Sequence, residues 1–564
     1  MAQANTYDAI VVGSGITGGW AAKELTEKGL SVLMLERGRN VVHGKDYIGE
    51  HRPPWTFKYR DLGDRQRYEE EYAIQSKCYA FSESTEHFFV NDKDNPYTYP
   101  EDKPFYWLRG YQLGGRSLMW GRQCYRWSDL DFEANAKDGY GVDWPIRYND
   151  IAPWYDYVER FVGISGQAEG MPVVPDGQFL PPMEMNSVER HVRDRMKAKY
   201  TDRVHTIGRV AVLTQQHGGR QACHYCGPCE RGCSTGSYFS TLSSTLPAAL
   251  ATGKLTVATD SVVHSVIYDE QSDRATGVRV LDPESQSMTE YKARVIFLCA
   301  STLGSTWILL NSSTPRFPNG LANSSGALGK YLMDHTWVFG ANGEIPGFED
   351  QYYRGNRPTG TYITRFRNVD KQEMDFLRGY AYQGGGARDG WERGANMPGF
   401  GTDFKHALRD PGQWRMRLAG FGEMLPYEDN AVTLNHDKLD ADGLPTLHID
   451  CSFHENELRM IADMQEQAAD MLTACGAKDI ITLGTPEAHP PGIGIHEMGT
   501  ARMGRDPKTS VLNGNNQCHD VPNLFVTDGA CMASSAMQNP SITYMALTAR
   551  ACDFAVERMK RGEL

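Results

Sequence analysis

The sequence predicts an α/β fold that begins with a parallel sheet, and three observations near the start of the chain lead to this prediction. Residues 9–12 form a short apolar run typical of a buried strand, residues 20–28 have the composition of a helix, and residues 31–35 form a second apolar run. A strand, a helix and a strand in this order indicate a βαβ unit, whose two strands are parallel. A chain of 564 residues is too long to form one simple hydrophobic core. At about 150 residues per domain, its length predicts two to four structural units.

A glycine-rich turn separates the first strand from the helix. Gly13, Gly15 and Gly18 fit the pattern G-x-G-x-x-G. In such a turn the first glycine permits a tight bend, the second lets the backbone approach a pyrophosphate, and the third lets the helix pack on the sheet. Ile16 and Thr17 lie within this turn, and the helix that follows has free N-terminal amides and partial positive charge, which favour phosphate groups.

An acidic residue, Glu36, ends the second strand. A carboxylate about 20 residues beyond the glycine turn can accept hydrogen bonds from ribose hydroxyls. The strand, the turn, the helix and the acidic residue therefore predict a dinucleotide site together. The turn alone does not separate FAD from NAD.

The pattern changes several times along the rest of the chain. Residues 43–104 are polar, aromatic and proline-containing, which predicts a long excursion over the fold, and residues 110–121 form a second glycine-rich segment. Short strands are predicted at residues 255–257, 262–263, 266–268, 277–280 and 294–298. Residues 340–490 are richer in strand and turn signals, and they contain one amphipathic helix at residues 455–475 that we expect to lie in a core.

Charge and hydropathy exclude several classes of function. The net charge of −13 argues against nucleic acid or an anionic membrane as a general partner. The first apolar run is too short for a signal peptide. The longest apolar stretch, residues 295–310, is interrupted by polar residues, whereas a membrane span needs about 20 mostly apolar ones. We therefore expect a chain that does not itself span a membrane.

Four of the 12 cysteines lie close together in residues 221–236. They are Cys223, Cys226, Cys229 and Cys233, with the local spacing of bacterial ferredoxin loops. This spacing predicts an iron–sulfur cluster, either [3Fe–4S] or [4Fe–4S]. Zinc is the alternative, because four thiolates suit a closed tetrahedral site. A ferredoxin loop has proline after its last cysteine, whereas Ser234 follows here.

The last 70 residues carry three motifs in order. Residues 496–504 read HEMGTARMG, residues 521–529 read VPNLFVTDG, and residues 539–543 read NPSIT. Together they resemble the glucose–methanol–choline (GMC) family of flavin oxidoreductases. The resemblance runs nearly end to end, since residues 114–117, 144–146 and 323–335 also look familial.

The resemblance implies a fold class and a division into domains. The fold would be α/β, with a Rossmann-like FAD-binding domain and an inserted α+β substrate domain built on an antiparallel sheet. The FAD-binding domain would comprise residues 1–60, 100–130, 220–340 and 490–564. The substrate-binding domain and excursions would comprise residues 61–99, 131–219 and 341–489.

The resemblance also implies the site. His496 would face the flavin N5 atom, with Asn539 as its partner. A neutral imidazole can take the hydroxyl proton while the α-hydrogen leaves as hydride, and an asparagine can hold the hydroxyl without competing for that proton. The cofactor-binding residues expected from the turns and the resemblance are Gly13, Gly15, Ile16, Thr17, Gly18, Glu36, Gly114, Gly115, Ser117, Val263, Asp528, Gly529, Asn539, Pro540 and Ser541. Some members of the family attach FAD covalently through a histidine in the second glycine segment. Residues 117–121 contain no histidine, so FAD would be held noncovalently.

A subset of bacterial GMC dehydrogenases carries a cysteine cluster, and the chain resembles the flavoprotein subunits of glycoside 3-dehydrogenases in this respect. The implied function is oxidation of a sugar or glycoside hydroxyl, at C3, with electrons leaving through the cluster to a cytochrome c. A small accessory subunit would carry the export signal, which places the protein in the periplasm; otherwise it would be cytoplasmic. A gluconate or polyol dehydrogenase, a pyranose-type oxidase and a non-catalytic electron-transfer subunit are the alternatives.

Overall fold

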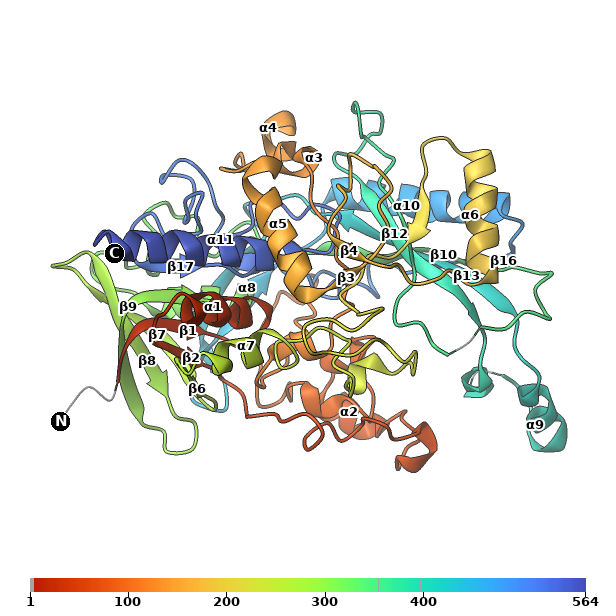
Figure 1. Ribbon diagram of the computed structural model, residues 1–564, viewed down its shortest axis with the longest axis horizontal. Helices are drawn as coiled ribbons and strands as arrows, with labels where there is room; N and C mark the ends of the chain where they lie inside the picture. Colours follow the sequence, from red (N-terminus) through yellow and green to blue (C-terminus); the bar gives the residue numbers. More distant parts are fainter. Residues whose placement is uncertain (1–4, 354, 396) are drawn as a thin grey trace.

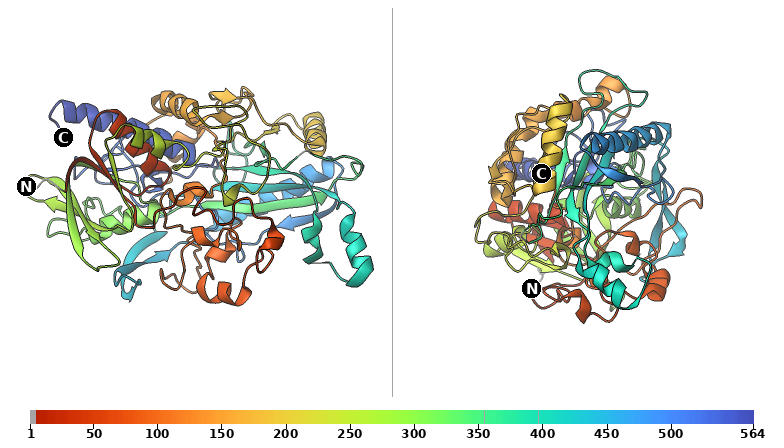
Figure 2. Two further views of the ribbon diagram at one scale, coloured as in Figure 1. Left: turned by 60° about the horizontal axis from the view of Figure 1, so that its bottom comes forward. Right: turned by 90° about the vertical axis from the view of Figure 1, so that its right-hand side faces the viewer.

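The computed structural model describes residues 5–353, 355–395 and 397–564. Two helix-covered sheets lie toward opposite ends of an elongated molecule (Figure 1). The first sheet contains the βαβ unit at the start of the chain, and the second is antiparallel. Figure 2 shows the same arrangement from two other directions, with the helix near residue 400 projecting at the far end. The predicted α/β fold class with an antiparallel second sheet is confirmed.

The first sheet has seven strands in the order β6-β2-β1-β9-β8-β7, with β17 also beside β9. They are β1 (Thr6–Val12), β2 (Val32–Leu35), β6 (Leu255–Ala258), β7 (Val262–Asp269), β8 (Arg274–Leu281), β9 (Met288–Leu298) and β17 (Leu524–Val526). The pairs among β6, β2, β1, β9 and β17 are parallel, whereas β7, β8 and the first half of β9 form an antiparallel meander.

The second sheet has six strands in the order β16-β10-β13-β12-β11-β5, and every pair in it is antiparallel. They are β5 (His205–Ile207), β10 (His335–Glu344), β11 (Thr361–Ile363), β12 (Tyr380–Arg388), β13 (Trp414–Glu423) and β16 (Lys478–Leu483). Two small pairs complete the strands, β3 (Ile164–Ser165) with β4 (Phe179–Leu180) and β14 (Ala431–Leu439) with β15 (Pro445–Asp450).

The α-helices of the described residues are α1 (Ile16–Glu27), α2 (Arg65–Glu71), α3 (Asp129–Phe132), α4 (Ala134–Asp138), α5 (Tyr148–Val162), α6 (Ser187–Lys199), α7 (Thr245–Ala251), α8 (Thr302–Asn311), α9 (Gly401–Arg409), α10 (Glu455–Ala474) and α11 (Ser541–Lys560). Within that part of the chain, no helix is both long enough and apolar enough to cross a membrane.

Both faces of the first sheet are buried. Ala9 and Val11 of β1 pack in a core with α1, α7 and α11, whereas Ile10 and Val12 point to the opposite face, toward α8. Because neither face meets water, β1 carries an unbroken apolar run at its buried end rather than an alternating pattern.

The second sheet is covered on one face by α10 and α6. Met464 of α10 and Val192 of α6 share a core with Phe339 and Leu418 of the sheet. The predicted core helix at residues 455–475 agrees with α10 to within one residue. A β-bulge at Val338, with φ of 81°, turns Trp337 onto the other face of the sheet although it is only two residues from Phe339.

One predicted boundary was wrong. Residues 262–263 and 266–268 were expected to be two short strands, but they belong to the single strand β7. The pairing of β7 with β8 shifts register between Val263 and Ser265. This irregularity interrupts the apolar pattern without ending the strand, which explains the apparent break.

Candidate active site

A cavity of about 750 Å³ lies between the two sheets. The glycine turn and the ends of β1 and β2 line it from the first sheet, and Trp337, Gln383, Arg417 and Phe421 line it from the second. The C-terminal loops contribute the residues that precede α11. The volume lies in the range of cofactor and ligand sites in proteins.

The N-terminal glycine turn is shaped to receive a phosphate group. Gly13 has φ of 95°, and a Cβ at Gly18 would lie 1.9 Å from the Gly13 carbonyl oxygen, so neither position tolerates a side chain. No atom lies within 4 Å of a Cβ built on Gly15, which leaves open space in front of the turn. Gly15 precedes α1, and no side chain caps its first amides, so these remain free for a pyrophosphate.

Ser14 connects the turn to the predicted ribose carboxylate and to the second glycine segment. The Ser14 amide donates to Glu36 Oε2 at 3.1 Å, and the Ser14 hydroxyl also donates to this oxygen. The Gly38 amide donates to Glu36 Oε1 at 2.8 Å, and the Gly114 amide donates to the Ser14 hydroxyl at 2.9 Å. A carboxylate has about four acceptor positions and three are used here, so Glu36, which lines the cavity, keeps one for a ribose hydroxyl.

The second glycine segment packs directly on the first. A Cβ on Gly115 would be 3.5 Å from Gly15 Cα, and the Thr241 amide donates to the Ser117 hydroxyl at 3.0 Å. Gly115 and Ser117 line the cavity, whereas Gly114 lies behind its wall. The donor chemistry and free space of these two segments fit FAD.

Most other predicted cofactor residues also reach the cavity. Its wall includes Ile16, Thr17, Val263, Asp528, Gly529, Asn539 and Ser541, whereas Gly18 and Pro540 lie behind it. Burial raises the pKa of Asp528 to about 6, and its side chain accepts from the Ser305 hydroxyl and the Ala530 amide. Pro540 stands at the N-terminus of α11, where no side chain caps the helix amides.

The two predicted catalytic residues lie side by side in the cavity wall. Asn539 Nδ2 is 3.5 Å from His496 Nε2. The Gln383 side-chain amide of β12 donates to Asn539 Oδ1, which turns the NH₂ group of Asn539 toward the histidine. A substrate hydroxyl at this place can therefore meet both side chains.

A second histidine, His335 at the start of β10, determines which nitrogen of His496 is free. His335 Nε2 lies 2.9 Å from the Ala536 carbonyl and 3.2 Å from the Ser535 carbonyl. Since carbonyls only accept, this nitrogen carries the proton of His335. His335 Nδ1 then accepts from His496 Nδ1, 2.8 Å away, and this leaves a lone pair on His496 Nε2.

Burial keeps both histidines neutral. It lowers the pKa of His335 to about 4, and the hydrogen bonds to Ser535 and Ala536 only partly oppose it. Burial lowers the pKa of His496 well below its usual value, and the nearby charge of Arg116 lowers it further. A neutral imidazole with a free Nε2 lone pair can accept a proton, as a general base must.

Asp334 holds the loop that carries His496. Its carboxylate accepts from the amides of Gly492 at 2.7 Å, Gly494 at 3.0 Å and His496 at 3.0 Å. A Cβ on Gly494 would lie 2.6 Å from this carboxylate, so glycine is required there. Burial, followed by the charge of Glu497, raises the pKa of Asp334 to about 7.

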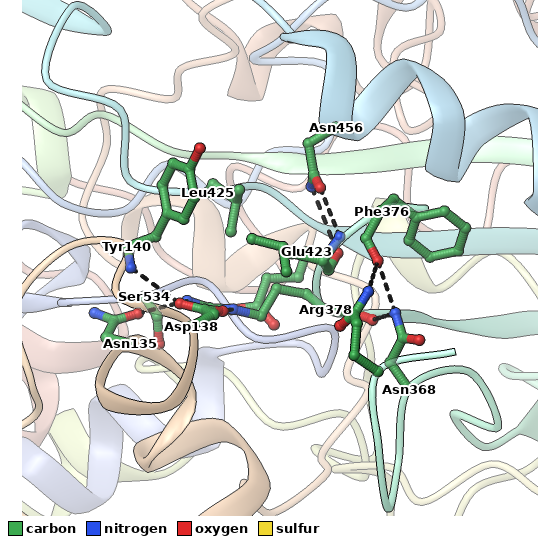
Figure 3. Close-up of polar contacts among 12 residues, drawn as sticks. Asn135, Asp138, Tyr140, Asn368, Phe376, Arg378, Glu423, Leu425, Asn456 and Ser534 are labelled. Carbon is green, nitrogen blue, oxygen red and sulfur yellow. Dashed lines mark hydrogen bonds and ion pairs between the residues drawn. The ribbon is translucent and has the colours of Figure 1, made fainter. Parts of the chain in front are cut away.

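An arginine network supports the loop whose carbonyls hold His335 (Figure 3). Arg378 Nη1 donates to Glu423 at 2.5 Å, and Arg378 Nη2 donates to Asn135 at 2.9 Å and to Asp138 at 3.0 Å. Asn135 Nδ2 in turn donates to the Ala533 carbonyl at 2.8 Å. The network joins α4, the second sheet and residues 533–536.

The four clustered cysteines lie in one loop beside the cavity. Cys223 Sγ accepts from the Tyr225 amide at 3.3 Å, and Cys233 Sγ accepts from the Tyr238 amide at 3.5 Å. Burial raises the pKa of Cys229 to about 12, and the charges of Cys223 and Cys233 are among the smaller contributions. Cysteine thiolates suit a soft metal, but in the described part of the chain no three His, Cys, Asp or Glu side chains converge as a ligand set.

Several residues of the site were missed from the sequence. His335 was recognised only as part of a familial segment, and Gln383 adjoins the unusual triplet Gly384-Gly385-Gly386. Arg116, in the second glycine segment, forms an ion pair with Glu497 at 2.8 Å. Nothing in the local sequence marks Arg417, because its place in the cavity depends on the pairing of distant strands.

Comparisons with known proteins identify the family of the chain. A family model described as GMC oxidoreductase matches residues 7–337, and a second with the same description matches residues 426–548. The chain is 28% identical to the 2-methyl-1,2-propanediol dehydrogenase of Mycolicibacterium austroafricanum, covering 98% of this chain and 96% of that protein. It is 26% identical to the fructose dehydrogenase large subunit of Gluconobacter japonicus, covering 98% of each.

A solved structure of another protein has a similar fold. Pyridoxine 4-oxidase from Mesorbium loti superposes with a TM-score of 0.60 at 16% identity, covering 97% of this chain and 98% of that one. At this identity the likeness concerns the fold alone. The family models span most of the chain, so it belongs to the GMC oxidoreductases and is an FAD-dependent enzyme that acts on CH–OH groups.

Proposed function

We propose that the enzyme is a dehydrogenase that oxidises a secondary hydroxyl of a sugar or glycoside, at C3 of a pyranose, to the 3-keto sugar. The observation that carries this proposal is the pairing of His496 Nε2, with its free lone pair, and Asn539 Nδ2 at 3.5 Å in the cavity wall. Two of the relatives are a propanediol dehydrogenase and a fructose dehydrogenase, and this supports a polyhydroxyl substrate.

The aromatic side chains of the cavity suit a sugar ring. Trp337 and Phe421 line it with their ring centroids 6.1 Å apart, and Phe421 lies 5.9 Å from the His496 ring. Such rings offer apolar faces to the C–H groups of a pyranose, while His496, Asn539 and Gln383 offer polar atoms to its hydroxyls. This mixture favours a carbohydrate over a purely apolar alcohol.

Oxidation requires a proton to leave the hydroxyl and a hydride to leave the carbon atom that bears this hydroxyl. Bound FAD, held noncovalently, supplies the hydride acceptor at its N5 atom. His496 Nε2 takes the proton, and its Nδ1–H bond to His335 keeps it in the required tautomer. Asn539 donates toward the substrate oxygen and fixes its direction. The hydride, which carries both electrons, and the proton together account for the conversion of CH–OH to C=O.

We also propose that Cys223, Cys226, Cys229 and Cys233 hold an iron–sulfur cluster, [3Fe–4S] or [4Fe–4S], which would pass electrons singly to a cytochrome c. Two observations support it: backbone amides donate to two of the sulfurs, and Glu230, next to Cys229, lines the cavity and pairs with Arg122 at 3.4 Å. Zinc is the alternative occupant. The proposal also includes a small accessory subunit, because one relative is itself the large subunit of a fructose dehydrogenase. It further includes export to the periplasm rather than a cytoplasmic location.

The test is anaerobic mixing of the purified holoprotein with methyl glucosides, glucose, gluconate and sorbitol. We expect glycosides to bleach the flavin absorbance and to yield 3-keto products identifiable by NMR. Reduction by gluconate or sorbitol alone would replace the glycoside with a polyol as substrate. Rapid peroxide formation in air would indicate an oxidase, and no reduction by any compound would indicate a non-catalytic electron-transfer subunit.

Iron and zinc analysis with EPR tests the cluster separately. Cys229→Ser is expected to lose iron and the reaction with cytochrome c while substrate still bleaches the flavin. Cys475→Ser, at the buried end of α10, is the matched control and should retain iron. Zinc in place of iron, or iron unchanged in the Cys229 variant, would contradict the cluster assignment.

A further inference from the structure

Five arginines line the active-site cavity, and four of them are engaged. Arg37 pairs with Asp440 at 2.8 Å, Arg116 with Glu497 at 2.8 Å and Arg122 with Glu230 at 3.4 Å, and Arg109 donates to the Asn95 carbonyl at 2.6 Å. The fifth is Arg417 of β13, whose guanidinium makes no hydrogen bond or ion pair with any residue that the structure describes.

Among the described residues of the cavity wall, no acidic side chain is left to pair with Arg417. The acidic residues there are Glu36, Glu230, Glu497 and Asp528, and each is engaged by another partner. Burial alone lowers the pKa of Arg417, with no acidic neighbour opposing it. The Arg417 side chain is nevertheless exposed and lines the cavity, so its guanidinium is available to pair with an anion that a ligand brings.

The position of Arg417 places that anion away from the reacting hydroxyl. Arg417 and Phe421 lie four residues apart on β13 and share a face, so their Cα atoms are about 13 Å apart. Phe421 adjoins His496, whereas Arg417 pairs in register with Gly385 of β12, which has no side chain (strands in Figure 1). A Cβ on Gly385 would lie 3.0 Å from Glu189 Oε1, and this carboxylate is already paired with Arg357.

We propose that Arg417 binds an anionic group of the substrate, a carboxylate or a phosphate, at the end remote from the hydroxyl that is oxidised. The inference rests on the proposed oxidation at His496, and it makes sugars or glycosides that carry a carboxylate or phosphate better substrates than their neutral counterparts. A guanidinium suits both anions, because its planar fork can donate two parallel hydrogen bonds to either.

The test compares matched neutral and anionic probes on the holoenzyme. The pairs are sorbitol with gluconate and glucose with glucose 6-phosphate, so the two pairs separate a carboxylate from a phosphate. Anaerobic flavin reduction gives KM and the limiting rate, and titration calorimetry on the oxidised enzyme gives Kd without turnover. We expect at least one anionic probe to bind more tightly than its neutral counterpart, with an affinity that falls as salt rises.

Arg417→Gln should weaken binding of that anionic probe about 10- to 100-fold, the effect of losing a hydrogen bond between charged groups, and leave the neutral probe nearly unchanged. Arg417→Lys should recover part of the affinity. Arg415→Gln is the control, since Arg415 lies on the same strand, pairs with Asp389 at 3.1 Å and does not line the cavity. FAD content should be equal in all variants.

Two results would overturn the inference. One is equal binding of neutral and anionic probes by the wild type, and the other is an Arg417→Gln variant that loses both kinds of probe equally. If gluconate or glucose 6-phosphate binds through Arg417 but no probe reduces the flavin, the anion site stands and the proposed oxidation fails. Loss of FAD on substitution would instead assign Arg417 to the cofactor.

Discussion

At the scale of single residues, the chemistry depends on a hydrogen-bond chain that ends at His496 Nε2. The carbonyls of Ser535 and Ala536 fix the proton of His335, and His335 fixes that of His496. On the other side Gln383 orients Asn539. His335 touches no reacting atom in this scheme, so it is a positioning residue, and its effect reaches the substrate through the tautomer of His496.

This hydrogen-bond chain predicts different outcomes for two substitutions of His335. His335→Leu removes the acceptor for His496 Nδ1–H and should slow flavin reduction about 10²- to 10⁴-fold, the range for general-base catalysis. His335→Asn places an amide oxygen near the former Nδ1 atom and should retain much more activity. Stopped-flow reduction measures the rates, and substrate Kd should stay unchanged in both.

The pH profile separates this role from a merely structural one. The base must be unprotonated, and burial lowers the pKa of His496. Activity should therefore stay constant through the usual histidine range near 6.5 and fall only at lower pH, as His496 takes up a proton. His335→Leu should move that acid limb. A profile that falls already at pH 6.5 in the wild type, or equal rates in the two variants, would contradict the assignment.

At the scale of secondary-structure elements, the active site is held where α4, the second sheet and residues 533–536 meet. Arg378 of the segment leading into β12 is buried and contacts Glu423 and Asp138, which are also largely buried. The Asn135 side chain connects this network to the Ala533 carbonyl. The network thus ties the docking of α4 to the position of the loop that holds His335.

Removing this arginine should destabilise the enzyme strongly. Arg378→Met leaves buried carboxylates unpaired, and we expect the free energy of unfolding to fall by about 3–5 kcal/mol. Arg459→Met removes an exposed pair with Glu455 on α10 and should cost less than about 1 kcal/mol. Urea unfolding of the holoproteins measures both. Similarly small decreases in the free energy of unfolding of both variants would show that the Arg378 network does not stabilise the packing of α4 on the second sheet.

At the scale of the whole molecule, one cavity joins segments from the entire chain. Gly13, Gly115 and Val263 reach it from one side, and Phe421 and His496 from the other. This arrangement suits an FAD-dependent oxidation in which the first sheet holds the cofactor and the second provides the substrate wall. The domain boundaries expected from the sequence remain a proposal.

The sequence was sufficient for the parts of the site that are local. The βαβ unit, the glycine turn, Glu36 and α10 each follow from residues adjacent in the chain, and the family follows from the ordered C-terminal motifs. The roles of His335, Gln383 and Arg417 could not be predicted, because they arise from antiparallel pairing between distant strands and from a bulge in β10. Register is a property of the fold and not of any short segment.

The most direct test of the central claim is anaerobic flavin reduction in the wild type and in His496→Ala at equal FAD content. The account predicts that a polyhydroxyl substrate bleaches the wild-type flavin, and that the variant binds FAD and substrate but is reduced about 10²- to 10⁴-fold more slowly. Reduction of both proteins at the same rate, or no reduction of FAD-loaded wild type by any alcohol, would contradict it.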